Sequence, residues 1–338
     1  MRGPAARAPP HDDPPARGAR AIPIRARRAA AALLCFAPAL LAATADDFSA
    51  RLDALWDFEA PAVSEARFRA ALARAAPKSR DAAETATQVA RSLSLQRKFA
   101  AADAILDGVA PALAALPARV RVRYLLERGR TRNSSGEPAQ AVPLFEAALA
   151  ASQRDAQDGA DFYRVDALHM LGIAAPEAQQ LDWNLKALAA AGASADPRAR
   201  GWRGSLLNNL GWTYHAKGDY AKALDLWQQA LALREAAGDT GRVAFARWTV
   251  ARGLRSVGRL DEAEAIQRSL AAAMEAAHAP DGAVYEELAE IALARNDAKA
   301  AMPWAARAYA LLKDDIWVNA NEPGRLARLA EVGGVTAR

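Results

Sequence analysis

Few of the side chains that usually perform catalysis or bind metals occur in this sequence. It has four histidines and one cysteine in 338 residues. The glycine-rich phosphate loops, the HExxH zinc motif and the GxSxG motif of serine hydrolases are all missing from it. His169 and His215 have no histidine or cysteine at the spacing that a metal site needs. The sequence therefore predicts no metal, no cofactor and no enzymatic activity, with a site made of His169, His215 and Glu127 as a remote alternative.

Charge is unevenly distributed along the chain. The 44 basic and 39 acidic residues give a formal net charge of +5. Residues 1–28 contain seven arginines and two aspartates, so the whole excess lies there, and the rest of the chain holds 37 residues of each sign. A neutral chain lacks the overall basic character on which nucleic-acid binding depends. We therefore predict no nucleic-acid partner.

The first 45 residues have the pattern of a secretory signal peptide. An apolar run at residues 29–43 follows the basic stretch, and the small residues Ala43, Thr44 and Ala45 close it. This order predicts cleavage after Ala45. The run of 15 residues is shorter than the roughly 20 that a membrane-spanning helix needs, so no stable membrane anchor is expected. The prediction is a periplasmic or secreted protein; the alternative is a cytoplasmic scaffold or sensor with an uncleaved N-terminus.

The rest of the chain consists of helical runs that repeat about every 40 residues, a period typical of stacked repeats. Apolar residues recur at helical spacing on both sides of short turns, without the alternation typical of strands. The turns are predicted at Arg97, Gly136, Gly218, Gly258 and Asn296. One more unit, residues 166–188, fits between the second and third of these turns and has Pro176 at its own turn.

This period predicts an all-α fold of stacked helix hairpins. A single hairpin cannot bury its apolar face, so neighbouring hairpins must pack against one another. We expect a signal peptide at residues 1–45 and an N-terminal helix pair at 46–80. About six repeats are then expected at 81–312, followed by a capping helix and tail at 313–338.

The unit at residues 208–231 resembles the tetratricopeptide repeat family. The residues that carry the resemblance are Leu210, Gly211, Tyr214, Gly218, Tyr220, Ala223, Trp227 and Ala230. Other units match less fully over about residues 85–312, and their spacing of about 40 residues is similar to that of kinesin-light-chain repeats. The resemblance implies a right-handed superhelical solenoid that binds a protein or peptide partner in its concave groove.

The resemblance also implies which residues face that groove, because the first helix of each hairpin lines it in this family. The predicted partner-binding residues are Arg91, Glu127, Arg130, His169, Asn208, Asn209, Trp212, His215, Trp248, Arg252 and Arg255. Asparagine amides can bind a peptide backbone, arginines can bind carboxylates, and tryptophans can act as apolar anchors. Two alternatives stay open: Trp212 and Trp248 belong to the core between helices, or the Asn208–Asn209 pair only favours a helix start.

Overall fold

Every regular element of the described chain is helical. The computed structural model describes residues 47–58, 60–154, 159–238, 240–315, 318–319 and 322–336. The predicted signal peptide at residues 1–45 lies outside these ranges. Within them, no helix combines the length and the apolar character needed to cross a membrane.

Contacts between helices divide the described chain into two compact units. The boundary lies inside one helix, α10 (Arg203–Ala216), between Leu206 and Leu207. We call the described residues up to Leu206 the N-terminal unit and those from Leu207 onward the C-terminal unit. Each unit is described by itself.

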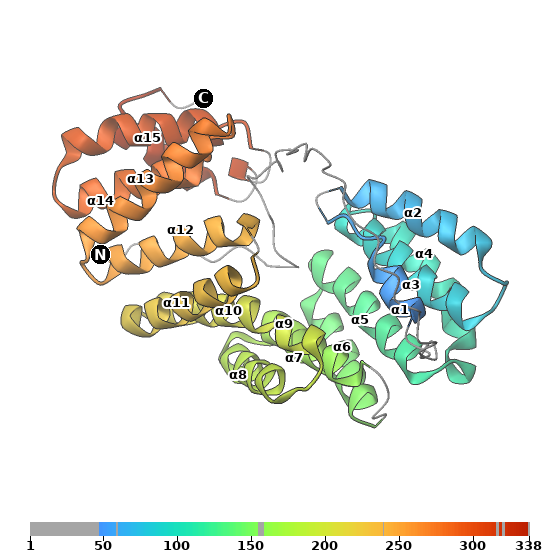
Figure 1. The fold of residues 1–338 in the computed structure, drawn as a ribbon. Coiled ribbons are helices and arrows are strands. Elements are labelled where there is room, and N and C mark those ends of the chain that lie inside the picture. The colour runs from blue at the N-terminus through green and yellow to red at the C-terminus, as the bar shows by residue number, and fades with distance from the viewer. Residues whose placement is uncertain are drawn as a thin grey trace, which may run out of the picture. The chain divides into compact units, whose positions relative to one another are not determined.

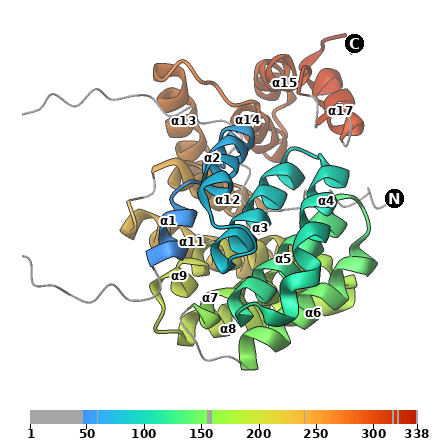
Figure 2. The same cartoon turned by 90° about the vertical axis from the view of Figure 1, so that its right-hand side faces the viewer.

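The N-terminal unit is a series of antiparallel helix hairpins that follow the chain order (Figure 1). Its helices are α1 (Asp47–Asp53), α2 (Pro61–Arg74), α3 (Arg80–Leu95), α4 (Phe99–Val109), the 3-10 helix η1 (Ala110–Ala115), α5 (Ala118–Ser134), α6 (Pro138–Arg154), α7 (Ala160–Ala174), α8 (Glu177–Ala193) and α9 (Pro197–Gly201). The hairpins are α3 with α4, α5 with α6 and α7 with α8. Their first helices also contact one another, α3 with α5 and α5 with α7, so they form one layer (Figure 2).

The C-terminal unit repeats this arrangement. It contains most of α10 and then α11 (Tyr220–Ala236), α12 (Thr240–Ser256), α13 (Leu260–Ala276), α14 (Gly282–Ala294), α15 (Ala298–Leu312) and α17 (Pro323–Gly333). The hairpins α12 with α13 and α14 with α15 contact each other along the chain, and α17 packs on α15. The predicted fold class, an all-α stack of helix hairpins, is confirmed. The predicted domain limits at residues 45, 80 and 312 stay predictions.

The turns of the hairpins lie at the predicted positions. Backbone φ is positive at Arg97, Gly136, Gly218, Gly258 and Asn296, between 60° and 92°. Glycine adopts this left-handed conformation without steric cost, whereas in arginine the Cβ atom then lies too close to the backbone. The same turn geometry is therefore made with and without glycine, and this is why the repeat is recognisable in some units and degenerate in others.

Small residues let the two helices of a hairpin approach each other. A Cβ atom at Gly211 of α10 would lie 2.3 Å from Nε1 of Trp227 in α11, and one at Gly129 of α5 would lie 2.4 Å from the Phe145 ring in α6. Both rings are fully buried. A glycine in the first helix therefore makes room for the largest side chain of the facing helix.

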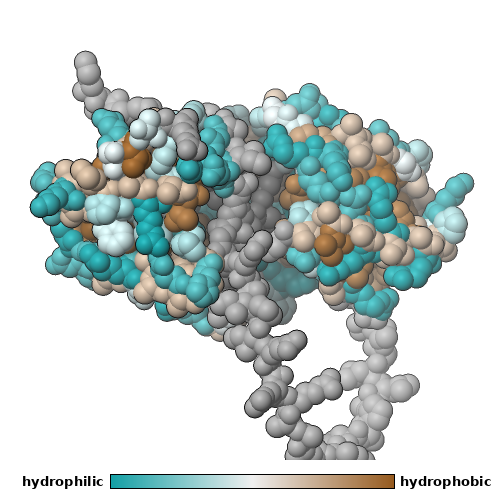
Figure 3. Space-filling view, turned by 90° about the horizontal axis from the view of Figure 1, so that it is seen from above, coloured by the Kyte–Doolittle hydropathy of each residue, from teal (hydrophilic) through white to brown (hydrophobic). Residues whose placement is uncertain are grey.

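On the face seen in Figure 3, apolar residues form separate small groups among hydrophilic ones. Large apolar side chains that are at least 40% exposed are Phe58, Val63, Leu185, Tyr220 and Met302, and they come from different helices and loops. Contiguous exposed apolar patches usually mark interaction sites, whereas scattered exposed apolar residues need no special explanation. A binding site is therefore better sought in a pocket with specific chemistry.

Candidate ligand-binding site

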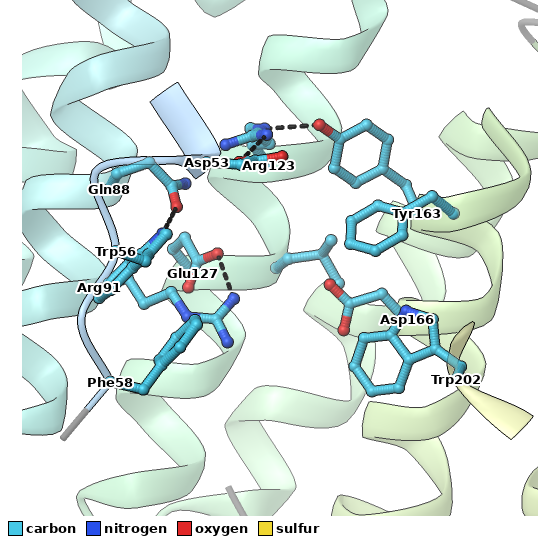
Figure 4. Close-up of a pocket in the computed structure, with 12 residues that line it drawn as sticks. Asp53, Trp56, Phe58, Gln88, Arg91, Arg123, Glu127, Tyr163, Asp166 and Trp202 are labelled. Atoms are coloured by element: carbon cyan, nitrogen blue, oxygen red, sulfur yellow. Dashed lines mark hydrogen bonds and ion pairs between the residues drawn. The ribbon is translucent and has the colours of Figure 1, made fainter. Parts of the chain in front are cut away.

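A pocket of about 220 Å³ lies in the N-terminal unit, against the layer of first helices α3, α5 and α7 (Figure 4). Its walls are Asp53, Trp56, Phe58, Gln88, Arg91, Arg123, Leu126, Glu127, Phe162, Tyr163, Asp166 and Trp202. Five of these twelve residues are aromatic and five are charged. Ligand sites commonly combine apolar walls with a few placed polar groups, although most are somewhat larger.

One wall is the loop between α1 and α2. The Trp56 and Phe58 rings are stacked, with centroids 4.7 Å apart and planes 4° from parallel. Trp56 Nε1 donates a hydrogen bond to Gln88 Oε1 on α3 at 3.1 Å. The Arg91 guanidinium carbon lies 5.5 Å from the Trp56 ring centroid and 5.6 Å from that of Phe58. A cation at this distance from an aromatic ring is attracted to it, so α3 fixes the loop.

The pocket floor contains a ladder of alternating charges that crosses three hairpins. Arg91 Nη1 on α3 lies 3.4 Å from Glu127 Oε1 on α5, and Arg130 Nη1, one turn further on, donates to the same oxygen at 2.8 Å. Arg130 Nη2 also donates to Asp166 Oδ1 on α7. Glu127, Arg130 and Asp166 are each at most 7% exposed. Buried charges cost free energy unless they are paired, so each member of this ladder requires the next.

A second buried arginine ties α1 to the same layer. Arg123 Nε donates to the Tyr163 hydroxyl at 2.6 Å, and Nη2 donates to Ser49 Oγ and Asp53 Oδ1, both at 2.9 Å. Burial works to lower the pKa of Arg123, but the facing Tyr163, Asp53 and Glu84 outweigh it and hold that pKa above its ordinary value. Arg123 is therefore charged, and its guanidinium is hydrogen-bonded to side chains of this chain.

Tyr163 and Trp202 lie on the opposite side of the pocket (Figure 4), and Phe162 also lines it. The Trp202 ring lies 6.2 Å from the Phe162 ring and 4.9 Å from the His169 ring, measured between centroids. Trp202 follows the short helix α9, whose first turn is capped by a hydrogen bond from Arg198 N to Asp196 Oδ1 at 2.8 Å. This capped turn brings Trp202 back onto α7.

The C-terminal unit contains a separate cluster of aromatic residues and arginines. Arg252 lies over Trp212 and Trp248, with its guanidinium carbon 5.3 and 5.8 Å from the two ring centroids. Trp212 also packs at 5.0 Å against the buried Trp227, so it belongs partly to the core between helices. Trp248 Nε1 donates to the Ala283 carbonyl at 3.1 Å. The buried Nε1 of Trp212 has no hydrogen-bond partner among the described residues.

Both arginines of this cluster bind a carboxylate of the chain itself. Arg255 forms a two-point contact with the Glu287 carboxylate of α14, with Nη2 at 3.3 Å from Oε2, and Arg252 Nη1 lies 3.6 Å from Oε2. Glu287 is only 1% exposed. The arrangement matches that of Glu127 in the N-terminal unit, where one buried glutamate also holds two arginines.

His215 lies beside this cluster, next to Ser256. Its Nε2 is 2.9 Å from Ser256 Oγ, and that hydroxyl donates its hydrogen to the Arg252 carbonyl at 3.0 Å. Ser256 must therefore accept from His215, the reverse of the contact in which a histidine removes a proton from a nucleophilic serine. Burial, with Arg252 and Arg255 next in size, lowers the pKa of His215 to about 4. Within the described ranges, no three histidine or acidic side chains are grouped so as to hold a metal ion.

The two asparagines of α10 differ in accessibility. Asn208 is 5% exposed, and its backbone carbonyl accepts a hydrogen bond from Trp227 Nε1 at 3.1 Å. Asn209 is half-buried. Only Asn209 of this pair therefore offers its amide to a partner without a rearrangement of the helices.

Comparisons with known proteins identify the repeat. Residues 202–276, which span α10 to α13, match the family model of the tetratricopeptide repeat. This stretch of the chain is a tetratricopeptide repeat region. No curated protein matches its sequence.

Solved structures share the fold at low sequence identity. Aspartyl phosphate phosphatase F from Bacillus subtilis matches with a TM-score of 0.53 at 14% identity, over 86% of this chain and 82% of that one. NprR in complex with its cognate peptide NprX matches with a TM-score of 0.51 at 14% identity, over 84% and 83%. A signal transduction ATPase with a tetratricopeptide repeat sensor from Pyrococcus horikoshii has a TM-score of 0.61 at 14% identity; the match covers 86% of this chain and 45% of that protein.

The predicted groove residues fall into two groups. Arg91, Glu127 and Arg130 share the ladder of the N-terminal unit, with His169 behind Trp202. Trp212, His215, Trp248, Arg252 and Arg255 form the cluster of the C-terminal unit, next to Asn208 and Asn209. The arginines were expected to attract carboxylates of a partner; the structure pairs all four with carboxylates of this chain.

Several residues of the pocket were not anticipated. Trp56 and Phe58 precede the repeats, and Trp202 follows the extra short helix α9 between hairpins, so repeat offsets do not apply to any of them. Asp166 and Arg123 do lie on first helices: Asp166 is three residues before His169, and Arg123 is four residues before Glu127. The sequence signal that could have identified them is that first helices of adjacent hairpins have residues of opposite charge.

Proposed function

We propose that this protein is a noncatalytic scaffold that binds an extended segment of a peptide or protein along the first helices of its hairpins. The observation that carries the proposal is the pocket on α3, α5 and α7, where aromatic walls surround a floor of ordered charges. A packed ion ladder holds these side chains in place before any partner arrives. Preorganised side chains lower the entropy cost of binding.

The fold of NprR, which was solved with its cognate peptide, supports a peptide as the occupant. The phosphatase among the similar structures shows that enzymes also use this fold. For the present chain we propose a role without catalysis, because the Ser256 hydroxyl is directed at a backbone carbonyl and His215 has a low pKa.

We also propose that the protein is exported and acts in the periplasm or outside the cell, on the basis of the pattern in residues 1–45. The alternative is a cytoplasmic scaffold that keeps its N-terminus. N-terminal sequencing of the natural protein distinguishes the two: Asp46 as the first residue supports export, and an intact N-terminus contradicts it.

Capture of the natural partner tests the binding function. The tagged full-length protein is expressed in its own host, chemically cross-linked and purified, and the attached proteins are identified by mass spectrometry. We expect Trp202→Ala to reduce the yield of the partner at least about fivefold, since aromatic anchors carry much of the binding energy in such sites.

The matched control is Trp183→Ala, which removes a half-buried tryptophan from α8, a second helix that contributes nothing to the pocket. This control corrects for any general loss of stability. Equal capture by the wild type and the Trp202→Ala protein would show that the pocket is not the binding site.

A further inference from the structure

We propose that the pocket of the N-terminal unit receives a positively charged side chain of the bound segment, that of lysine or arginine. This inference rests on the proposed function and specifies the chemistry of the same site.

The first argument is the charge of the walls. Three acidic residues, Asp53, Glu127 and Asp166, and two basic ones, Arg91 and Arg123, line the pocket, while Arg130, which pairs with Glu127 and Asp166, is not among the lining residues. A small site with low-dielectric walls strengthens the attraction between the lining carboxylates and an entering cation.

The second argument is hydrogen-bonding capacity. Arg91 and Arg123 already contact carboxylates of this chain, Glu127 and Asp53. In contrast, Glu127 uses only Oε1, while its Oε2 is buried without a hydrogen-bond partner among the described residues. A buried acceptor without a donor costs free energy, and a ligand that supplies N–H groups removes that cost. At Glu127 the unused hydrogen-bonding capacity is therefore that of an acceptor.

The third argument is the aromatic lining. Trp56 and Phe58 form one wall, and Trp202 and Tyr163 form the other, where Asp166 lies next to Trp202 (Figure 4). Arg91 already lies over the first pair. Phe58 is 49% exposed, so this wall remains open to solvent. Aromatic faces combined with carboxylates favour ammonium and guanidinium groups.

An anionic side chain fits the same site poorly. It would have to displace Glu127 from Arg91 or Asp53 from the buried Arg123, and the displaced carboxylate would then lose that partner. Separation of a buried ion pair is strongly unfavourable. A neutral apolar side chain could contact the aromatic walls but would leave Glu127 Oε2 unsatisfied.

Peptide pools test the inference with the protein as its natural host produces it. The pools consist of acetylated and amidated nonapeptides with a fixed central residue, either Lys, Arg, norleucine, Gln or Glu, between flanks randomised in the same way. Peptides retained on the immobilised protein are quantified by mass spectrometry. We expect Lys and Arg pools to be retained at least about fivefold more than the norleucine pool, and the Glu pool to be retained least.

Two variants locate this preference. Glu127→Gln keeps the shape of the floor and removes its charge, so the Lys and Arg preference should fall to about the level of Gln. Glu146→Gln changes an exposed glutamate on α6 and should keep the preference intact. Trp202→Leu provides a second pocket variant in case Glu127→Gln fails to fold, which circular dichroism reports. The preference should also weaken in that variant.

The outcomes separate this inference from the proposed function. Retention that does not depend on the central residue, or a preference for Glu, overturns the cation pocket while peptide binding stands. A cation preference that survives in folded Glu127→Gln and Trp202→Leu also overturns it, because the preference then belongs to another site. No retention of any pool above a blank support overturns both.

Discussion

Arg130 lies between two carboxylates, Glu127 on its own helix and Asp166 on the next hairpin, and all three side chains are buried. Such a chain of charges holds neighbouring hairpins in one register, since a shift by a helical turn would leave charges unpaired. The contribution of these ion pairs to the free energy of unfolding is therefore best tested by substituting one charged residue and then two.

We expect Arg130→Met to lower the free energy of unfolding by about 3 kcal/mol, because Glu127 and Asp166 lose a buried partner. Addition of Asp166→Leu to this variant should restore part of the loss, since one of the two stranded carboxylates is then removed. Urea denaturation measures both values. Strictly additive losses in the double variant would show that the two side chains are not coupled.

His215 provides a test of pH dependence. Its pKa of about 4 in the folded protein is lower than the ordinary value of 6.5, mainly through burial. Between pH 6.5 and pH 4 the unfolded chain therefore binds a proton that the folded chain does not, so stability falls as the pH falls through this window.

When the pH is lowered from 7 to 5, we expect the free energy of unfolding to fall more in the wild type than in His215→Gln. The expected difference is on the order of 1 kcal/mol, a value that already allows for the partial exposure of the ring. Urea denaturation at the two pH values gives this difference. Nuclear magnetic resonance titration of the ring gives the pKa directly, and a value near 6.5 would contradict the environment described for His215.

At the scale of the helix hairpin, the glycine-to-ring contact determines how closely two helices pack. Gly211→Ala would place a Cβ atom 2.3 Å from the Trp227 ring nitrogen, and that ring is fully buried. We expect a loss of about 2–3 kcal/mol in the free energy of unfolding, the usual cost of overpacking a core. Gly192→Ala in α8 is the control, because its Cβ meets nothing within 4 Å. The better helix propensity of alanine should make that variant neutral or slightly more stable.

The hairpins themselves could be predicted from the sequence, and the pocket only in part. Turn positions from Arg97 to Asn296 followed from local signals, because each hairpin encodes its own helices and its own turn. The partners of the arginines could not be predicted in this way. Arg91 meets Glu127 and Arg130 meets Asp166 across 36 residues, so these contacts depend on how neighbouring hairpins stack.

The pocket walls escaped prediction for a related reason. Trp56 lies in a loop before the first repeat and Trp202 follows the extra helix α9, so neither occupies a repeated position. Their side chains reach the pocket because Gln88 binds one of them and His169 and Phe162 pack against the other. Such contacts follow from three-dimensional packing rather than from a period.

At the scale of the whole molecule, substantial contacts join helices that are neighbours or next neighbours along the chain. The stability of such stacks is roughly a sum over repeats and their interfaces. Damage to one hairpin should therefore have effects that decrease along the stack.

Hydrogen exchange tests this locality in the Arg130→Met variant. We expect faster amide exchange in α5, α6 and α7 and little change in α14 and α15, because exchange reports local opening as well as global unfolding. Wild-type protein at the same pH and temperature is the reference. A uniform increase over all helices would show that the chain unfolds as one cooperative block.

The fit of ring to glycine also has a consequence for how such a chain can diversify. Gly129 accommodates Phe145, Gly172 accommodates Asn184 and Gly211 accommodates Trp227, so each gap is matched to one side chain of a different size. Recombination that joined the first helix of one repeat to the second helix of another would place a side chain of the wrong size against the glycine. The intact hairpin is therefore the smallest segment that can be duplicated, deleted or exchanged without loss of the core, and viable crossover points should lie in the loops between hairpins.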